Sequence, residues 1–521
     1  SSLRSLLHPP IGMPPDLHKE DYYHGLLPRA DAEDLLLSVG DCVVRLSHES
    51  SSAQLLTERH YILSVCVEPG SSKVHWRRPG FEALPKIVKH VLIHHTTERG
   101  YCIGKEFFEC IPSLIACYTT APIINKNIHS HPLFLTPIAR QHWELEAEEV
   151  AIGRVMRSGR TREIHFGLLH TRGKVEIDVT IKVIKVHEQR KEAVKEMMHE
   201  VRCLLQCHSP FVMRLLGVVV MTEPCLMTME QASEFLSSFL ERNAGLSEAA
   251  KIDLCLQCSL AIVYVHSLDF VVRNIAARNF YCCGGGKVKF GDFSLARRLL
   301  CETEATPSVS ISPMSPKPPR SSSSSSSKKS PSAKSAFSKT TSSANSKTQS
   351  ITPPTKSTTT EPSVTASATL SAISEREKRK TKPSFRDTTS IPLPMRWRAP
   401  ECLQYASYSQ KSDVWAFGVL CWEIYHAGRT PLPGMSSGEV QHFILTGQHL
   451  VFESIAPRVK EYILEKIFAE NPDDRYVMEE SARMLEFFLG LEGGKKSSQE
   501  KTDSKEKVVG GKEKENSKEK G

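Results

Sequence analysis

The stretch from Val271 to Arg297, VVRNIAARNFYCCGGGKVKFGDFSLAR, constrains the fold of this chain more than any other. Its pattern predicts a short strand, a polar loop, a hairpin turn at Gly284–Gly286, a second strand over Lys287–Phe290, and then Asp292. The polar loop carries two arginines and two asparagines, Arg273, Asn274, Arg278 and Asn279. A hairpin that brings two amides and a carboxylate together predicts a site for a metal-bound phosphate.

The composition suits a globular protein of two or three domains. The chain has 521 residues, of which 40% are hydrophobic. No run of about 18 apolar residues is present, so we expect no transmembrane segment. The N-terminal segment, residues 1–19, is too rich in proline and has too short an apolar core for a signal peptide.

Cysteine usage and charge narrow the expected location and partners. The 15 cysteines show no paired metal spacing, which indicates free thiols in a reducing compartment and predicts a cytoplasmic protein. The net charge of +8 is modest, and much of it lies in low-complexity segments. We therefore expect no nucleic-acid partner.

The stretch that begins at Val271 resembles the catalytic loop and metal-binding motif of protein tyrosine kinases, H-R-D-L-A-A-R-N followed by D-F-G. Three positions depart from that pattern, namely Val272 for the His, Asn274 for the catalytic Asp and Ser294 for the Gly. The resemblance implies that Asn279 and Asp292 hold Mg²⁺ and that Arg278 lies near the substrate hydroxyl. A carboxamide at the position of the catalytic base is far less basic than a carboxylate.

The resemblance extends over residues 141–491, which open with HWELEAEEVAIG, similar to the start of kinase domains of the Fes/Fer kind. A strand is predicted by apolar residues at alternate positions, Val175, Ile177, Val179 and Ile181. Helical spacing in the next segment places Glu200 near the middle of a helix. The resemblance identifies Val179-Thr180-Ile181-Lys182 with the family's V-A-I-K, and Glu200 with the ion-pair partner of its lysine.

The phosphate-covering loop is predicted over Met156–Ile164, MRSGRTREI. The family has glycines at three spaced positions there, because backbone amides must approach the nucleotide phosphates closely. Only Gly159 remains, and Arg157 and Arg162 occupy the outer two positions, where their side chains would crowd the loop. The residues that the resemblance implies for nucleotide binding are Gly159, Lys182, Met229 and Glu230, the last two beginning the hinge that binds adenine.

Residues from about 303 to 384 are mostly Ser, Thr, Pro and Lys, which predicts a disordered insert in the activation segment. No tyrosine lies between Asp292 and Pro400, so the phosphotyrosine switch that orders such a segment is missing. The resemblance implies three residues that hold the large lobe together, Glu401 of A-P-E, its partner Arg475, and Asp413, which braces the catalytic loop. The charged tail, residues 492–521, is predicted to be disordered.

Residues 20–115 form a first compact unit, followed by a proline-containing linker over 116–140. Its strand DCVVRLS would place Cys42, Val44 and Leu46 on one face and Arg45 on the other. An arginine that points inward needs an anion, because an unpaired buried charge costs several kcal/mol. A structural ion pair would meet this need, as would a bound anionic ligand.

This unit resembles a Src-homology-2 (SH2) domain, through the opening Tyr23-His24-Gly25 and the strand Cys42-Val43-Val44-Arg45. The resemblance implies an α+β fold in which a central antiparallel sheet is flanked by two helices, the second over Glu82–His94. It also implies that the unit binds phosphotyrosine. The residues that would do so are Arg29, Arg45, Ser47 and His60, helped by the loop Ser50–Ser52.

Three functions are compatible with these features: a working tyrosine kinase, a kinase fold with poor or no phosphoryl transfer, and a binding module attached to a scaffold. We favour the second, because Asn274 and the damaged glycine loop affect one site. We expect a multidomain protein, an SH2 domain followed by a bilobal kinase fold, that binds phosphotyrosine-containing proteins or engages another kinase. ATP and Mg²⁺ are its expected cofactors, with doubtful turnover. Phosphotyrosine partners would recruit it to the inner face of the plasma membrane.

Overall fold

The structure is a computed structural model that describes residues 16–48, 59–68, 87–123, 128, 133–171, 173, 175–185, 190–299, 384–386 and 393–491. Residues 303–383 of the predicted insert, the tail from 492 to 521 and the loop Ser50–Ser52 lie outside these ranges. The disorder expected of the insert and the tail therefore stays a prediction.

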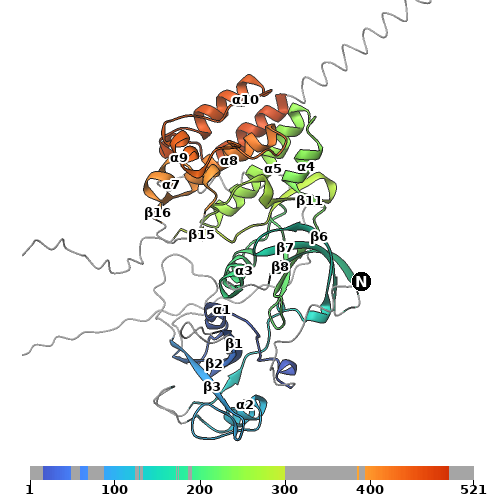
Figure 1. Ribbon diagram of the computed structural model, residues 1–521, viewed down its shortest axis with the longest axis vertical. Coiled ribbons are helices and arrows are strands. Elements are labelled where there is room, and N and C mark those ends of the chain that lie inside the picture. Colours follow the sequence, from blue (N-terminus) through green and yellow to red (C-terminus); the bar gives the residue numbers. More distant parts are fainter. Residues whose placement is uncertain are drawn as a thin grey trace, which may run out of the picture. The chain divides into compact units, whose positions relative to one another are not determined.

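The first unit is built on a five-stranded sheet in the order β4-β3-β2-β1-β5 (Figure 1). Its strands are β1 (Asp41–His48), β2 (Arg59–Glu68), β3 (Ile87–Thr96), β4 (Gly100–Cys102) and β5 (Thr136–Pro137). Neighbours are antiparallel except β1 and β5, which run parallel. Two helices accompany the sheet, α1 (Arg29–Leu35) and α2 (Ile111–Thr120), as the predicted architecture required.

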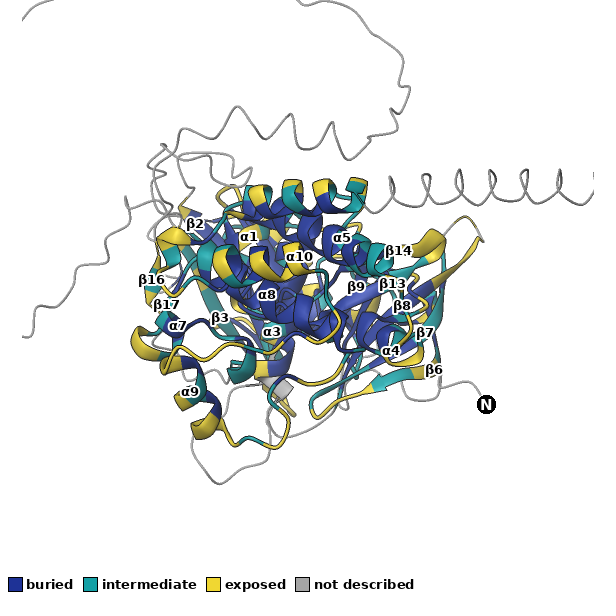
Figure 2. Cartoon of the chain, turned by 90° about the horizontal axis from the view of Figure 1, so that it is seen from above, coloured by how far each residue is buried: buried dark blue, intermediate teal, exposed yellow. Residues whose placement is uncertain are grey.

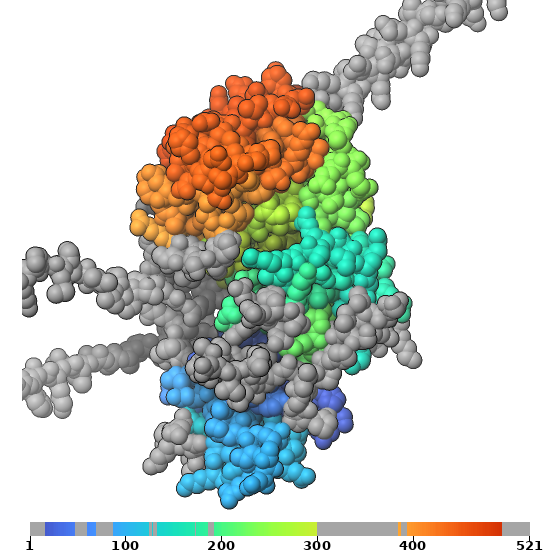
Figure 3. Space-filling view, viewed as in Figure 1, coloured from blue at the N-terminus to red at the C-terminus, as the bar shows by residue number. Residues whose placement is uncertain are grey.

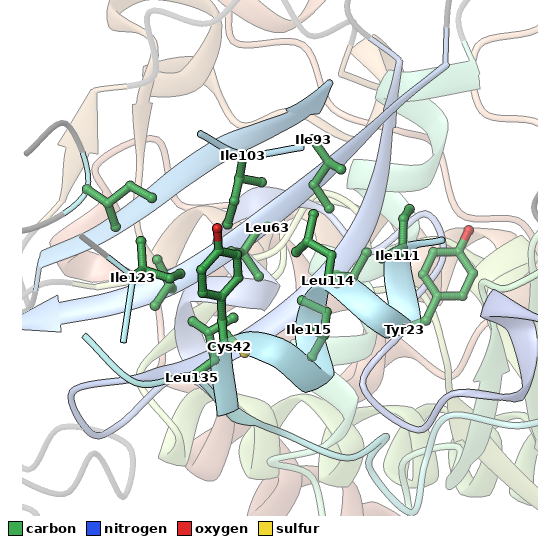
Figure 4. Close-up of a cluster of buried hydrophobic side chains, with 14 of the residues drawn as sticks. Tyr23, Cys42, Leu63, Ile93, Ile103, Ile111, Leu114, Ile115, Ile123 and Leu135 are labelled. Atoms are coloured by element: carbon green, nitrogen blue, oxygen red, sulfur yellow. The ribbon is translucent and has the colours of Figure 1, made fainter. Parts of the chain in front are cut away.

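The core of this unit lies between the sheet and α2 (Figure 4). It combines Cys42 of β1, Leu63 of β2 and Ile93 of β3 with Leu114 of α2, each less than a tenth exposed. Residues expected in the linker also belong to it: Ile123 and Leu135 are buried in the same cluster, and β5 pairs with β1. The first unit therefore takes up most of the segment 116–140.

The helix predicted over Glu82–His94 is wrong from Ile87 onward, because Ile87–His94 belongs to strand β3, and residues 82–86 lie outside the described ranges. β3 pairs antiparallel with β2, with Val91 opposite Leu63 and Ile93 opposite Tyr61, and the register shifts between Cys66 and Glu68. Valine and isoleucine fit such a pleated surface better than a helix, where their branched side chains lose rotamer freedom. The second helix of the unit is α2.

The small lobe of the second unit is a five-stranded antiparallel sheet in the order β6-β7-β8-β10-β9, with helix α3 (Arg190–Leu204) beside it. Its strands are β6 (Val150–Ser158), β7 (Arg162–His170), β8 (Glu176–Ile184), β9 (Leu215–Val219) and β10 (Leu226–Glu230). On β8, Val179 and Ile181 join the core as predicted, whereas Ile177 is 39% exposed near the strand's beginning.

The large lobe is mainly helical. Its helices include α4 (Leu236–Arg242), α5 (Glu248–Ser267), α7 (Pro400–Tyr405), α8 (Gln410–Tyr425), α9 (Ser437–Leu445) and α10 (Pro457–Tyr462), and residues 478–491 are also helical. Every residue of α8 from Ser412 to Tyr425 is buried, and the helix is dark blue in Figure 2. The short strands are β11 (Glu234–Phe235), β12 (Phe270–Val271), β13 (Phe280–Cys283), β14 (Lys287–Phe290), β15 (Arg297–Arg298), β16 (Phe385–Arg386) and β17 (Ser407–Tyr408).

Among the described helices, α5 alone is long and apolar enough to cross a membrane by length and composition. However, 67% of that apolar window is buried inside the structure, and α5 packs against α8 and β14. Burial against other helices is the usual reason for such an apolar helix in a lobe core. We therefore interpret α5 as a core helix.

A buried ion pair ties the helix α7 to the end of the large lobe, as predicted. The Arg475 guanidinium donates two parallel hydrogen bonds to Glu401, at 2.7 and 2.8 Å, and its side chain is 0% exposed. It also donates to three backbone carbonyls, those of Ala469, Lys411 and Glu470. Every donor direction of this guanidinium is thus used inside the protein.

We predict that Arg475→Ala destabilises the large lobe by about 3 kcal/mol, because the partly buried Glu401 loses its partner and the fully buried Arg475 site is left empty. The measurement is urea unfolding followed by tryptophan fluorescence. The control is Arg242→Ala, which removes an ion pair to Glu234 from a side chain that is 66% exposed, and should cost about 0–1 kcal/mol. Equal losses in the two variants would contradict the structural role given to Arg475.

Candidate functional site

The loop that follows β12 is held in place by Asp413 of α8. The backbone N–H groups of Val272 and Arg273 donate to its two carboxylate oxygens at 2.7 and 2.9 Å, and His266 Nε2 lies 3.0 Å away. Arg273 has a positive φ of 62°, a conformation that these two bonds stabilise. The predicted brace is present, so the following side chains have fixed positions.

The structure brings together four residues that were predicted to form the site: Asn274, Arg278, Asn279 and Asp292. Asn274, which is 8% exposed, donates from Nδ2 to Asp292 Oδ2 at 3.3 Å and accepts from Arg278 Nη2 at 3.2 Å. Asn279 Nδ2 donates to the backbone carbonyl of Asn274 at 2.8 Å, which leaves its own amide oxygen as an acceptor. An amide thus lies where the family has a proton-accepting carboxylate.

Asp292 accepts hydrogen bonds on both of its oxygens. Oδ1 accepts from the backbone N–H of Ser294 at 3.1 Å and from its hydroxyl at 2.7 Å, and Oδ2 accepts from Asn274. Burial acts to raise the pKa of Asp292, but the charges of Lys182 and Arg162 and the Ser294 hydrogen bonds lower it overall. The carboxylate therefore stays ionised and is largely satisfied by the chain itself.

The predicted ion pair of the small lobe is also present. Lys182 on β8 donates to Glu200 on α3 at 2.6 Å, and both side chains are at most 3% exposed. Arg162 adds a second cation, 3.7 Å from Glu200 and 3.4 Å from Glu196. Burial raises the pKa of Glu200, and the Lys182 and Arg162 charges oppose this shift.

The predicted phosphate-covering loop is a tight hairpin between β6 and β7. The Gly159 N–H donates to the Arg162 carbonyl at 2.9 Å, which closes the turn, and Gly159 is exposed. Arg157 extends from β6 across to the large lobe, where it donates to the Arg278 carbonyl at 3.0 Å and to the Ser237 hydroxyl at 3.2 Å. In Figure 3, the turquoise surface, which includes β6 and β7, adjoins the green surface of the residues that follow in the chain.

The hinge region is hydrogen-bonded on both sides. Met229 is buried, and the Glu230 carboxylate accepts from Lys289 Nζ at 2.7 Å and from the Arg214 N–H at 2.9 Å. Two residues further, the Ala232 N–H donates to the Thr180 hydroxyl at 2.9 Å. This contact was not predicted, because Thr180 and Ala232 belong to separate segments and nothing in either segment marks it.

The residues predicted to bind phosphotyrosine lie around the face of β1 that is opposite the core. Arg45 is 6% exposed, and its Nε donates to the Ser64 hydroxyl at 3.1 Å. Arg29 at the start of α1 is 68% exposed. His60 lies on β2 opposite Ser47, whose side chain is outside the described residues.

Sequence reasoning missed three residues of this pocket. The Ser64 hydroxyl lies 2.9 Å from His90 Nδ1, His90 Nε2 lies 2.9 Å from Glu33 Oε1, and Glu33 also accepts from Arg29 at 2.7 Å. Partial burial acts to raise the pKa of Glu33, but the hydrogen bonds of Arg29 and His90 lower it overall. His90 escaped notice because its strand was expected to be a helix.

Glu423 is a further residue that the sequence did not reveal. Its carboxylate accepts from the Ala277 N–H and from Trp397 Nε1, both at 3.0 Å. The Arg278 guanidinium lies over the Trp397 ring, 4.2 Å from its centroid. Glu423 therefore fixes the loop that carries Ala277 and Arg278, and burial raises the pKa of Glu423 to about 7.

Comparison with known proteins shows similarity to protein kinases. A family model described as "Protein tyrosine and serine/threonine kinase" matches residues 150–320 and 371–485. Human tyrosine-protein kinase Fer is 23% identical over 468 residues, which cover 88% of this chain and 43% of that protein. Fer-related kinase 1 of Caenorhabditis elegans is 21% identical over 485 residues, 91% of this chain and 95% of that protein.

A viral relative has the same level of similarity. The transforming protein Fps of Fujinami sarcoma virus is 23% identical over 484 residues, which cover 91% of this chain and 42% of that protein. The chain thus spans less than half the length of the human and viral relatives and nearly all of the nematode one.

We predict a pH dependence of stability from Glu423. Below about pH 4.5 it is protonated in both states, and between about 4.5 and 7 only the folded state keeps the proton, so stability falls as the pH rises through this window. Glu423→Gln should remove this fall, making the variant more stable than the parent by up to about 3 kcal/mol at pH 8. Urea unfolding at several pH values measures the difference.

The control for this window is Glu439→Gln, at the exposed start of α9. The Ser436 hydrogen bonds lower the pKa of Glu439, so its titration lies below pH 4.5. This variant should keep the parent's slope between pH 4.5 and 7. If the stability of the Glu423→Gln variant falls with pH as steeply as that of the parent, the pKa of Glu423 is not raised in the folded chain.

Proposed function

Because the chain belongs to the protein tyrosine and serine/threonine kinase family, with Fer-like and Fps-like relatives, we propose that it is a signalling protein of the non-receptor tyrosine kinase type. It binds phosphotyrosine through its first unit, an SH2 domain. Its kinase domain transfers phosphate poorly or not at all. The observation that carries this proposal is the hydrogen-bonded amide of Asn274 at the position of the catalytic base.

Asn274 cannot accept the proton of a substrate tyrosine. Its oxygen already accepts from Arg278, its nitrogen donates to Asp292, and a carboxamide has little basicity at neutral pH. Loss of a positioned general base typically costs about 10²- to 10⁴-fold in rate. The intact Lys182–Glu200 pair and the braced loop support the alternative, an active tyrosine kinase, because phosphoryl transfer depends mainly on positioning and charge.

ATP and Mg²⁺ are the cofactors that family membership implies. Lys182, Asn279 and Asp292 are the residues that would hold them, with Mg²⁺ supplying charge neutralisation at the phosphates. Asn279 fits this role, because its amide oxygen is left as an acceptor. Asp292 Oδ1 accepts two hydrogen bonds from Ser294, whereas Oδ2 accepts only one, from Asn274, and keeps an acceptor site that a metal ion would use. No transfer step follows from this arrangement.

Phosphotyrosine binding is supported by the two arginines and the histidine beside β1. Arg45 is buried and fixed by Ser64, and Arg29 and His90 lie next to each other through their shared partner Glu33. A buried guanidinium can grip a dianionic phosphate with two parallel hydrogen bonds, which is the strongest common mode of phosphate recognition. The partners are therefore phosphotyrosine-containing proteins, and another kinase is a second class of partner through the kinase-like lobe. We place this role in the cytoplasm, with recruitment to the plasma membrane by such partners.

We predict that Arg45→Ala lowers the affinity for a phosphotyrosine peptide by at least about 100-fold, because a charge-assisted pair of hydrogen bonds is lost. Arg45→Lys should restore little of it, since a lysine cannot form the planar pair. Fluorescence polarisation with a labelled peptide measures both. Arg99→Ala, an exposed arginine that lies over Phe107, is the control and should bind like the parent. Undiminished binding by Arg45→Ala would remove the basis for the first unit's role.

We predict that the unaltered chain phosphorylates a tyrosine peptide about 10²- to 10⁴-fold more slowly than an active tyrosine kinase assayed beside it. Radiolabelled ATP with Mg²⁺ measures the transfer. Lys182→Met is the control, because any signal that survives this change comes from a contaminating kinase. A rate that matches the active kinase and disappears in Lys182→Met would establish the alternative function.

A further inference from the structure

We infer that the chain's own side chains occupy its nucleotide site, the region defined by Lys182, Met229, Glu230, Asn279 and Asp292, and that the folded domain excludes ATP with Mg²⁺. This inference rests on the proposed function only for the location of that site. It goes further by giving nucleotide exclusion, rather than loss of a base, as the first reason for inactivity. Three groups of contacts carry it, at the mouth, the floor and the hinge of the site.

The mouth is closed by Arg157, which stands at the first glycine position of the phosphate-covering loop. Its guanidinium forms hydrogen bonds to the Arg278 carbonyl and the Ser237 hydroxyl, and it lies over the Phe235 ring, 4.2 Å from the centroid. These contacts join the small lobe to the large lobe through a side chain that a glycine would lack. A cation held over an aromatic face and bonded to a backbone carbonyl is well placed to keep the lobes together.

The floor is filled by Tyr281 of β13. Its ring centroid lies 4.7 Å from that of Phe235, and the side chain is 2% exposed. Next to Asp292, Gly291 has no side chain, and a Cβ atom there would lie 2.7 Å from Tyr281 Cε2. The ring therefore occupies space that any other residue before Asp292 would use. Burial raises the pKa of the Tyr281 phenol, and the charges of Glu200 and Asp292 add to this shift.

The hinge end is closed by Thr180, at the position of the alanine in V-A-I-K. Its hydroxyl accepts from the Ala232 N–H at 2.9 Å, and both residues are 0% exposed. Backbone N–H groups of the hinge are the donors that adenine needs, and this donor is already paired in a buried position. An incoming base would have to displace a satisfied hydrogen bond without water to compensate.

The metal position also has an internal hydrogen bond. An aspartate at position 274 would face Asp292 across about the 3.3 Å that the amide now spans, and two carboxylates at that distance repel unless a cation lies between them. With the amide, the contact is a hydrogen bond to a carboxylate. The two side chains therefore stay together without a metal ion between them.

The test is a titration of the 521-residue chain with a fluorescent ATP analogue in the presence of Mg²⁺. We expect no saturable binding by the parent up to about 1 mM, the upper end of ordinary substrate affinities. The combined variant Arg157→Gly, Thr180→Ala and Tyr281→Leu should bind saturably, at least about 10-fold more tightly than the parent's limit. Arg154→Gly is the matched control, since Arg154 also lies over an aromatic ring, Phe166, but is exposed on the same strand, and it should leave binding absent.

Each outcome decides the inference. Saturable micromolar binding by the parent overturns it, and so does a combined variant that is folded, by its thermal melting and phosphopeptide binding, yet still excludes the analogue. Should the combined variant not fold, Arg157→Gly alone serves, because this half-buried residue lies near the hairpin tip. It must then gain measurable binding. The proposed function is tested separately. If the parent binds ATP but transfers no phosphate, the proposed function still holds and only this inference fails. If the parent does not bind phosphotyrosine peptides through Arg45, the proposed function fails, whatever the nucleotide result.

Discussion

The hydrogen bond from the Asn274 amide to Asp292 is the interaction on which the state of the site depends. In a kinase with two carboxylates here, closure requires a divalent cation, because like charges at this separation destabilise the folded site. The amide removes that requirement. Arg157 and Arg162 then bring two positive charges into the same region, and Arg162 approaches Glu200 and lowers the pKa of Asp292. The chain thus balances its buried acids with its own cations, as a metal ion would otherwise do.

The contacts that stabilise each lobe do not depend on the amide at position 274. Asp413 still fixes the catalytic loop, Arg475 still pairs with Glu401, and Lys182 still pairs with Glu200. Arg273 adds a contact that does not need phosphorylation: its guanidinium lies 5.6 Å from the Phe385 ring and 5.4 Å from the Tyr408 ring, on two paired strands. Cation–π contacts of this kind stabilise the segment that follows the insert. They do so without a phosphotyrosine, since no tyrosine lies between Asp292 and Pro400.

Motif spacing and apolar alternation were sufficient to predict the strands β1 and β14 and the grouping of Asn274, Asn279 and Asp292, and the family resemblance predicted the Lys182–Glu200 pair. These features are local, or lie in motifs with fixed spacing. The contacts that close the site were not predictable in this way. Tyr281 meets Gly291 and Phe235, and Thr180 meets Ala232, through tertiary packing that no periodicity reports. The helix expected over Glu82–His94 failed for a related reason, because pairing with β2 decided its conformation.

A site filled by its own side chains has a consequence for signalling. In an enzyme the relative position of the two lobes depends on the bound nucleotide, because a ligand shifts the equilibrium by its differential affinity for each arrangement. Here Arg157 bonds directly from β6 to the Arg278 carbonyl and to Ser237, so the arrangement depends on the chain alone. The surface that the lobes present to a partner is then the same at every ATP concentration. That property suits a domain that functions by binding a partner protein. It would be a disadvantage in an enzyme, which must bind and release nucleotide in each catalytic cycle.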